Sequence, residues 1–461
     1  MSLIKDSEEC SKSPVEFFST PPTQTVIESS NTVDTRPTTA PRDGTAIDFY
    51  IPEATDQYID GQNCKLYTKV KITRENGGDL LAADVTAPIN DLANGLYSNV
   101  ELFLNDQLVS QSNNMHGYVS MISHLIHDSD ESLQSERSMR LLYKDTPSQM
   151  DAINAKIANR TNLIRGYDIV VGDNGAVTEI PETIGNNGLH QRYLLTRGSR
   201  HVELLTSLRI DLFEQVRYLP SGVSMKLRFH PQKNAFMLMG PENSTFKVKI
   251  LEAYLLVRRV TPSPGVLVGH EDTIKMMPAK YPVTRKLCKS FAVAQGLRGT
   301  VLDNVFLSQV PKRVVIGMVD GDAFAGCYNK NPYNFKHYNV DYMQLFVDGN
   351  PVNLRPLKPN IAARDYIHCY ETLYRGLNRM DGERGSIIKR ADWDKGYSLF
   401  AFDLTPDMDP DDHYSLIRHG NVRLEIQFSE ALAQTIDIIV YAEFDSILEI
   451  TSDRNIITDY V

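Results

Sequence analysis

The sequence predicts an all-β protein built from two consecutive β-sandwiches. Similar segments recur in the same order in the two halves of the chain, and each half holds about nine short apolar segments bounded by turn residues. A helical pattern follows the central hairpin in both halves. A chain of 461 residues also exceeds the size of one ordinary hydrophobic core, which favours two domains.

The first repeat is a hairpin pattern, found at residues 102–109 and again at residues 345–352. Each copy contains an apolar stretch, a turn and a second apolar stretch. The turns contain Asn105-Asp106 in the first copy and Asp348-Gly349-Asn350 in the second. These residue types tolerate the left-handed backbone that a tight hairpin needs, so both segments are expected to form hairpins.

Three further matches follow along the chain. They are a helical pattern and two strand patterns, at residues 118–126 and 366–374, 225–229 and 424–428, and 250–254 and 440–444. One short match can arise by chance in any β protein, but four collinear matches indicate that one unit occurs twice. The expected equivalent pairs are Leu102 with Leu345, Tyr118 with Tyr366, Leu227 with Ile426, and Tyr254 with Phe444.

The same alignment predicts which way the side chains of the repeated hairpins point. Neighbouring residues of a strand face opposite sides of the sheet, so a slip of one residue would reverse every side chain. We therefore expect Phe103 and Phe346 to point the same way in their two sheets, opposite to Leu102 and Leu345.

The chain divides by composition into a tail, two sandwiches and a linker. Residues 1–44 are rich in Ser, Thr and Pro and are expected to be flexible. The first sandwich is expected at 45–260, with a long loop excursion at 129–203 that has no counterpart in the second half. A linker is expected at 261–283, where Pro and Gly interrupt the pattern, and the second sandwich at 284–461.

An apolar cluster lies within the tail, at Val15, Phe17 and Phe18. It represents either residual hydrophobicity in a flexible segment or an anchor that docks on a neighbouring subunit. The sequence leaves both interpretations open.

Composition excludes several classes of function. The net charge of −10 argues against a direct nucleic-acid partner, because such a surface repels phosphate. No apolar run is long enough for a transmembrane segment, and the N-terminus lacks the layout of a signal peptide. The cysteines are odd in number and widely spaced, which predicts free, mostly buried thiols in a reducing compartment: Cys10, Cys64, Cys288, Cys327 and Cys369.

Two groups of residues could hold a metal ion. His124 and His127 lie three residues apart, near Asp128 and Asp130, but a surface histidine pair at a helix end is the favoured interpretation. A second group is rich in carboxylates that could bind calcium, although it lacks the glycine and glutamate of an EF-hand. The favoured interpretation of this second group is a solvated acidic loop. Its members are Asp403, Asp407, Asp409, Asp411 and Asp412.

Catalytic patterns are also missing. The glycine-rich, hydrolase and metalloprotease motifs are absent, and nothing brings a nucleophile or a second carboxylate to His368, Asp365 and Glu371. Trp393, the single tryptophan, is interpreted as an interface anchor or as a local core residue. The sequence therefore predicts no catalytic, cofactor-binding or metal-binding residue, no cofactor, and a protein that is not an enzyme.

Two collinear sandwiches, each with a helix after its central hairpin and one with a long excursion, resemble the double jelly-roll major capsid proteins. The tail and residues 441–450 look most like the Polinton/Maverick group, which is related to adintoviruses and virophages. The resemblance covers about residue 45 to the C-terminus and rests on architecture, because capsid folds carry no catalytic motif.

This resemblance implies two eight-stranded jelly rolls and a homotrimeric, pseudo-hexagonal capsomer that tiles an icosahedral virion shell. It implies neighbouring capsomers, vertex or penton proteins and minor capsid proteins as partners. Assembly would take place inside the host cell, in the cytoplasm or nucleus.

Two other functions stay open. A glycan-binding protein or glycan amidase built on two jelly rolls would need acids and aromatics along a cleft, for which Glu371, Asp392 and Trp393 could serve. Such proteins are usually secreted and disulfide-bonded, which these cysteines do not suit. The chain could also be a capsid gene that a host has retained for another use.

Overall fold

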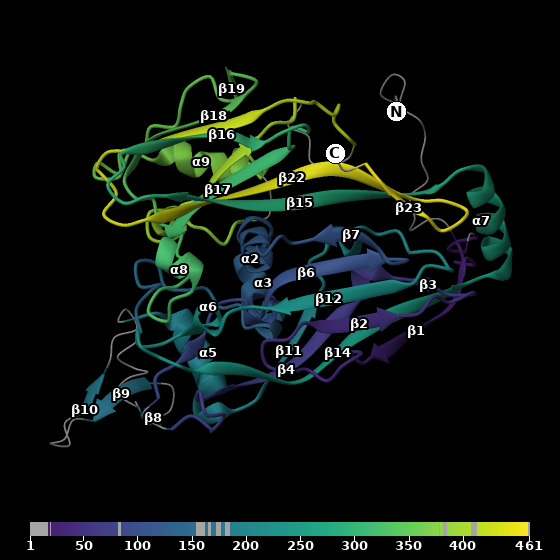
Figure 1. Cartoon of the computed structure of the whole chain (residues 1–461), viewed down its shortest axis with the longest axis horizontal. Helices are drawn as coiled ribbons and strands as arrows, with labels where there is room; N and C mark the ends of the chain where they lie inside the picture. Colours follow the sequence, from purple (N-terminus) through teal and green to yellow (C-terminus); the bar gives the residue numbers. More distant parts are fainter. Residues whose placement is uncertain are drawn as a thin grey trace.

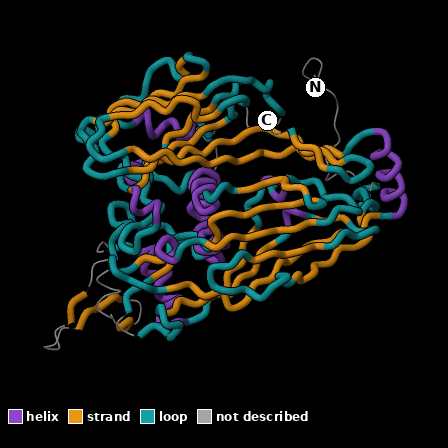
Figure 2. The backbone as a smooth tube through the Cα atoms, in the orientation of Figure 1, coloured by secondary structure: helices purple, strands orange, loops and turns teal. Residues whose placement is uncertain are grey.

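The structure is a computed structural model that describes residues 17–18, 20–81, 84–153, 162–164, 167–171, 177–179, 185–377, 379–380, 385–406 and 413–459. Two β-sandwiches lie one above the other, and α7 (Pro264–Met276) connects them at one end (Figure 1). Strands form the long layers of both sandwiches, and helices gather between them and at the end opposite α7 (Figure 2). The predicted fold class, an all-β double jelly roll, is confirmed.

The first roll contains two main sheets. One sheet has the order β1-β14-β4-β11, with β3 also paired to β14. The other has the order β2-β12-β6-β7. The strands are β1 (Ile27–Thr35), β2 (Ile47–Ile51), β3 (Tyr58–Ile59), β4 (Lys65–Thr73), β6 (Tyr97–Leu104), β7 (Gln107–Gln111), β11 (Val202–Ser207), β12 (Met225–Pro231) and β14 (Lys247–Pro262).

The second roll repeats this arrangement. Its sheets have the orders β15-β22-β17-β20, with β23 also paired to β22, and β16-β21-β18-β19. Each strand thus has a counterpart at the same place in the first roll. The strands are β15 (Ala279–Val293), β16 (Gly299–Phe306), β17 (Arg313–Asp320), β18 (Val340–Val347), β19 (Asn350–Pro351), β20 (Phe400–Asp403), β21 (Val422–Phe428), β22 (Ile436–Ile450) and β23 (Ile456–Thr458).

Short helices and two smaller groups of strands connect these sheets. The helices are η2 (Gly61–Asn63), α1 (Leu92–Gly95), α2 (His116–His127), α3 (Asp130–Gln134), η3 (Glu136–Arg140), α5 (Asn187–Thr196), η4 (Arg197–Ser199), η5 (Asp211–Phe213), α6 (Asn234–Met237), α8 (Gly321–Ala325), α9 (Ile367–Arg375) and α10 (Arg390–Trp393). The remaining strands are β5 (Ala87–Pro88), which pairs with β13 (Leu238–Met239), and β8 (Asn162–Ile164), β9 (Tyr167–Val171) and β10 (Val177–Glu179), which form a separate sheet.

The side-chain pattern explains why these segments are strands. In β4, buried and half-buried residues alternate along most of its length, as expected where one face covers the core. In contrast, β17 is buried throughout, and β22 is buried on both faces from its start to Phe444. These two strands are central in their sheet, and other parts of the chain cover their second face.

The ladder registers test the predicted equivalences. Leu102 pairs with Leu227, whereas Leu345 pairs with Leu424. With Leu102 placed on Leu345, the counterpart of Leu227 is therefore Leu424, two residues before the predicted Ile426. A shift of two residues leaves the side chain on the same face, so the predicted inward direction is correct although the alignment is not.

The predicted equivalence of Tyr254 and Phe444 is wrong. Phe444 is 2% exposed, whereas Tyr254 is half-buried and stacks on Tyr67 at a ring-centroid distance of 4.3 Å. Its neighbours along β14, Ala253 and Leu255, are the buried residues there. Tyr254 therefore faces the opposite side of its sheet from Phe444, and β14 has a bulge between Ile250 and Glu252 that changes its register on β4.

The expected boundaries differ from the structure in two places. Residues 27–35, placed in the flexible tail by composition, form β1 and pair with β14. Most of the expected linker at 261–283 is α7 and the start of β15. Phe17 and Phe18 are 78% and 101% exposed. Val15 and Cys10 lie outside the described residues.

The two rolls share one continuous apolar core. Tyr118 of α2 contacts Tyr333 and Phe324 of the second roll, with ring centroids 5.7 Å apart in both pairs. Gly117 permits this approach, because a Cβ atom there would lie 2.7 Å from the Tyr333 hydroxyl. The helices α2 and α9 do not cover equivalent edges as predicted, since α2 packs mainly against β6 and β15 and α9 against β20.

The four described cysteines are free thiols, as predicted, and three of them are buried: Cys64, Cys288 and Cys369. Burial raises the pKa of Cys64 and of Cys369 to about 12, and it also raises the pKa of Cys288. None of the helices in the described part of the chain is long and apolar enough to cross a bilayer.

Candidate functional site

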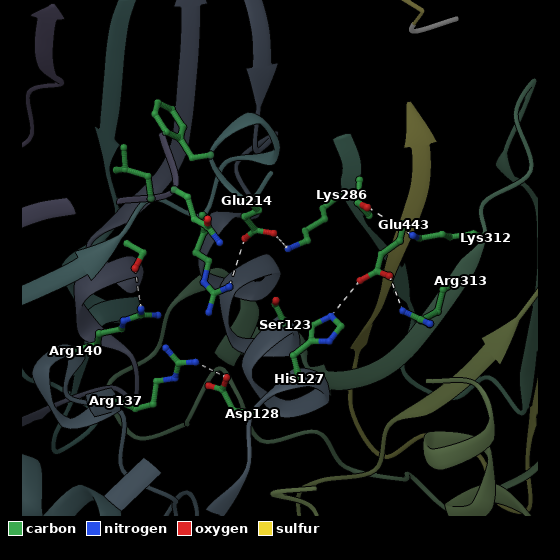
Figure 3. A pocket seen from close by; sticks show the side chains of 16 residues that line it. Ser123, His127, Asp128, Arg137, Arg140, Glu214, Lys286, Lys312, Arg313 and Glu443 are labelled. Atoms are coloured by element: carbon green, nitrogen blue, oxygen red, sulfur yellow. Dashed lines mark hydrogen bonds and ion pairs between the residues drawn. The ribbon is translucent and has the colours of Figure 1, made fainter. Parts of the chain in front are cut away.

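A charged cavity of about 470 Å³ lies where the two rolls meet (Figure 3). We call it the junction cavity. Its lining comes from α2, η3, η5 and the end of β11 in the first roll, and from β15, β17 and β22 in the second. The lining residues are Gln62, Ser123, His127, Asp128, Arg137, Arg140, Ser207, Leu208, Arg209, Phe213, Glu214, Thr284, Lys286, Lys312, Arg313 and Glu443.

The second roll contributes a buried carboxylate, Glu443 of β22. Arg313 Nη1 donates to Glu443 Oε2 at 2.8 Å, and the Tyr441 hydroxyl donates to Oε1 at 2.8 Å. His127 Nε2 lies 3.4 Å from the same Oε1 (Figure 3). Burial alone would raise the pKa of Glu443, but the contacts with His127 and Arg313 hold this pKa well below its usual range. Glu443 therefore stays ionised and joins α2 to the second roll.

The first roll contributes a histidine between two charged groups. His124 is fully buried, its Nδ1 lies 2.6 Å from Asp128 Oδ2, and its Nε2 lies 3.2 Å from Arg140 Nη1. Arg140 has no acceptor group, so Nε2 must accept and Nδ1–H must donate to Asp128. Burial lowers the pKa of His124, against the opposing effect of Asp128, so the ring is neutral.

Asp128 anchors a second cation. Arg137 Nη2 donates to Asp128 Oδ1 at 2.7 Å (Figure 3). Burial would raise the pKa of Asp128, but the hydrogen bond from His124 and the charge of Arg137 hold it well below its usual range. The pKa of Arg140 is lowered to about 10, first by burial and then by the neighbouring charge of Arg209. Arg137, Arg140 and Arg209 all line this side of the cavity, so its positive groups lie close together.

Glu214 connects the two sides. It is bonded to Lys286 Nζ of β15, and its Oε1 lies 3.4 Å from Arg209 Nη1. Burial raises the pKa of Glu214, but Lys286 and Arg209 outweigh this effect and lower it. Nearby Asp211 accepts from the backbone N–H of Lys286, and burial raises its pKa to about 7. Within the cavity, charged contacts thus connect the two rolls through Glu443 and through Glu214.

The structure separates the two histidines considered for metal binding. His124 contacts Asp128 inside the first roll, whereas His127 reaches Glu443 across the junction. The favoured interpretation, a surface pair, is wrong for His124, because helix α2 is buried between the rolls. Asp130 pairs with Lys389 instead. Among the described residues, no three His, Cys, Asp or Glu side chains are placed to hold a metal ion.

Trp393 is a core residue. It is completely buried, its Nε1 donates to the Leu399 carbonyl at 3.0 Å, and its ring stacks on Tyr366 with centroids 5.1 Å apart. Asp392 is paired with Lys144 at 2.6 Å. These two side chains therefore do not line a cleft, as a glycan site would need.

The remaining sequence candidates do not converge. His368 is 87% exposed and lies 3.7 Å from Glu371 one helical turn away, which is a surface pair on α9. Asp365 exchanges backbone hydrogen bonds with Asn360. In the acidic loop, Asp403 accepts from the backbone and hydroxyl of Thr405. The other members lie outside the described residues: Asp407, Asp409, Asp411 and Asp412.

Sequence reasoning missed the junction residues, although a signal was present for two of them. Glu443 is the single glutamate in the otherwise apolar stretch 438–444, and Arg313 directly precedes the apolar run of β17. A charge inside a buried strand requires a partner, so each of these residues predicts an ion pair. Arg140 and Arg209 carry no such signal, because they lie in short segments of mixed polar and apolar residues whose position depends on the fold.

The fold defines a class of known structures, viral capsid chains. A chain of the Sputnik virophage cryo-EM structure has a TM-score of 0.65 and 13% identity, covering 100% of this chain and 94% of that one. The Faustovirus major capsid protein has a TM-score of 0.55 and 9% identity, covering 94% and 92%. The mavirus major capsid protein has a TM-score of 0.52 and 11% identity, covering 100% and 96%. These likenesses establish the fold.

One curated protein is similar in sequence over nearly the whole chain. It is "Uncharacterized protein F54H12.2" of Caenorhabditis elegans, 25% identical over 432 residues, which are 88% of this chain and 93% of that protein. No protein-family model matches the chain.

Proposed function

We propose that this chain is a major capsid protein that assembles as a pseudo-hexagonal homotrimer into an icosahedral shell. The observation that carries the proposal is the duplicated sheet order, with β2-β12-β6-β7 matched strand for strand by β16-β21-β18-β19. Two similar rolls in each of three subunits place six sandwiches around a threefold axis, which approximates a hexagon and lets identical subunits tile a surface.

The junction between the rolls supports this role. A shell subunit must hold its two rolls at a fixed angle, because the outline of the trimer depends on that angle. The shared apolar core and the charged contacts of Glu443 and Glu214 join the rolls across the junction. The capsid proteins that share this fold support the same conclusion.

The partners follow from this proposal. The main partner is the same chain, within the trimer and in neighbouring capsomers, and a closed shell also requires vertex and minor capsid proteins. Exposed Phe17 and Phe18 are suited to contact a neighbouring subunit. The protein would accumulate in virion shells, formed in the cytoplasm or nucleus of the host cell. Resemblance in the tail and at residues 441–450 favours a gene of the Polinton/Maverick type.

Light scattering on the purified full chain tests the trimer, and negative-stain images test the outline of the particles. The expected results are a mass of three chains, from the 52.0 kDa subunit, and hexagonal particles or closed shells. A monomer over a wide concentration range would contradict the proposal.

A host-retained capsid gene is the second candidate, and the similarity to a nematode protein favours it. Such a protein could still form trimers but no longer assemble them into shells. Images of the protein over a range of salt and pH separate the two functions. Shells indicate a working capsid protein, whereas trimers that never join indicate retention for another use.

A further inference from the structure

The junction cavity contains more positive than negative charge, in a chain whose net charge is −10. Its lining has six Lys and Arg residues and three Asp and Glu residues. Four further carboxylates lie around it: Asp445 pairs with Lys312 and Glu136 with Arg137, both at 3.1 Å, Asp91 lies 3.7 Å from His124, and Asp211 accepts from the backbone N–H of Lys286. The excess of cations is thus confined to the residues that line the cavity, where His127 adds a further group able to carry positive charge.

Several donors around the cavity lack acceptors. The hydroxyl of Ser123 and the Nε atoms of Arg137 and Arg209 are buried and have no hydrogen-bond partner in the described part of the chain. Ser123 is 1% exposed, and it faces the cavity between His127 and Arg140 (Figure 3). A buried donor without an acceptor is costly, so two guanidinium N–H groups and a hydroxyl around one cavity indicate a missing acceptor.

His124 cannot serve as a hydrogen-bond acceptor for Arg209, because the proton of the neutral ring is on Nδ1. Nη2 of Arg209 lies 3.3 Å from His124 Nδ1, but that nitrogen carries the proton donated to Asp128. This contact therefore brings two donors together and is not a hydrogen bond. The remaining acceptor of Arg209 is Glu214, at 3.4 Å and shared with Lys286.

We propose that the junction cavity binds a phosphate-type oxyanion. Guanidinium groups present planar pairs of N–H donors that match phosphate oxygens, and Lys286 can add a point charge from the opposite roll. The cavity volume of about 470 Å³ falls within the usual range for small-molecule sites. The anion would accept from Arg209, Arg137 and Ser123, and it would neutralise the crowded charge beside Arg140.

Binding would strengthen the connection between the rolls. Arg137 and Arg209 belong to the first roll and Lys286 to the second, so one anion contacts both. An anion that binds only the folded chain raises its stability in proportion to the logarithm of its concentration. This inference concerns the folded subunit and does not depend on the proposed capsid role.

Calorimetric titration and thermal melting of the full chain test the proposal. Sodium pyrophosphate at millimolar concentration is compared with sodium chloride of equal ionic strength, because high concentrations of any phosphate stabilise proteins without specific binding. Saturable binding and a rise in melting temperature with pyrophosphate alone are expected. The same two measurements are repeated with inorganic phosphate and with ATP. Their comparison distinguishes a site for free phosphate from a site for a nucleotide. Equal melting temperatures in pyrophosphate and chloride would overturn the proposal.

Substitutions inside and outside the junction cavity test whether the anion binds there. Arg209→Gln should weaken pyrophosphate binding at least tenfold. The matched control, Lys358→Gln, removes an exposed cation of the second roll and should leave binding unchanged. Ser123→Asp places a carboxylate in the cavity, so it should raise the melting temperature in chloride and abolish the response to pyrophosphate. If Ser123→Asp lowers the melting temperature and the response persists, or if the control variant weakens binding equally, the anion does not bind in this cavity.

Discussion

Asn105 and Asp348 make the same pair of contacts in the two rolls. The backbone N–H of each donates to the carbonyl of a residue that precedes the central strand of its sheet, Ser224 or Asn421, at 3.1 and 3.0 Å. Each side chain then accepts from the N–H of that same residue at 2.8 Å. Both residues have positive φ, 47° and 49°. The duplication therefore extends to individual hydrogen bonds.

Removing these side chains should destabilise both hairpins. Asp348→Ala loses the hydrogen bond from the N–H of Asn421, whereas Asn105→Ala loses the contacts with the N–H and hydroxyl of Ser224 and with the Arg454 carbonyl. Both variants also place alanine in the left-handed region, so we expect Asp348→Ala to lower the free energy of unfolding by about 2 kcal/mol and Asn105→Ala by more. The two side chains share none of these partners, so the double variant should show the sum. Urea unfolding measures all three. The control is Asp106→Gly, at a φ of 64°, which should be neutral or slightly stabilising.

The sequence predicted the hairpins well because their information is local. Turn residues and the alternation of apolar side chains specify Leu102 and Leu345 as inward-facing, and both are fully buried. Phe103 and Phe346 both point outward as predicted, under Lys226 and Arg423 respectively. The equivalence of the long strands failed at Tyr254, because a bulge in β14 changes the register without any signal in the apolar pattern.

The ion pair of Glu443 and Arg313 should make stability depend on pH. The pKa of Glu443 in the folded chain lies well below its ordinary value of 4.5. Its contribution is therefore fully present above pH 4.5 and is lost as the pH falls toward the folded value. We expect Glu443→Gln to lower the free energy of unfolding by about 3 kcal/mol at pH 7.

Urea unfolding of the wild type and of Glu443→Gln at several pH values checks this expectation. The difference between the two proteins should be constant from pH 7 to about 5 and shrink below pH 4.5. A difference that grows on acidification would contradict it. Glu449→Gln, on the same strand but half-buried and paired with Lys280 at the surface, is the control and should have a small effect at every pH.

Truncation should separate β1 from the residues before it. Removing residues 2–22 leaves Gln24, whose side chain accepts from the N–H of Ile27 at 2.7 Å, so the melting temperature should change by no more than about 1 °C. Removing residues 2–42 deletes β1 and exposes the edge of β14, so we expect a fall of about 4 °C or more. Equal melting temperatures for the two truncated proteins would show that β1 contributes nothing.

The excursion of the first roll should carry contacts around the threefold axis. The expected excursion, residues 129–203, includes α5, whose buried Arg192 bonds to Asp145 and to the Pro88 carbonyl. A replacement should therefore be confined to residues 154–184. Substituting them with a Gly/Ser linker should leave the melting temperature nearly unchanged and abolish the trimer. Light scattering measures the result, and a shortened protein that still forms trimers would refute the assignment.

Replacing the buried tryptophan should destabilise the second roll. Trp393→Ala removes a completely buried ring that packs on Tyr366 and Phe400, so we expect a loss of about 3–5 kcal/mol in the free energy of unfolding. Trp393→Phe keeps most of the volume and should lose less. Chemical denaturation measures both, and a loss below about 1 kcal/mol for Trp393→Ala would show that the residue is not part of the core.

The junction cavity could be predicted only in part. Glu443 and Arg313 stand out as charges in apolar strands, but His127, the partner of Glu443, comes from a helix more than three hundred residues before it. Contacts of this kind depend on how the two rolls pack, which no local pattern encodes. The same reason explains the failure at His124, since its partners Asp128, Arg140 and Arg209 come together only in the folded chain.

The burial of three thiols has a consequence for how the folded chain responds to oxidants. With a pKa raised to about 12, Cys64 and Cys369 hold almost no thiolate at neutral pH, and only the thiolate attacks disulfides or electrophiles. Cys288 is protected in the same way. The core of the folded chain would therefore meet oxidants without these three thiols changing state, so its resistance to oxidation follows from packing alone.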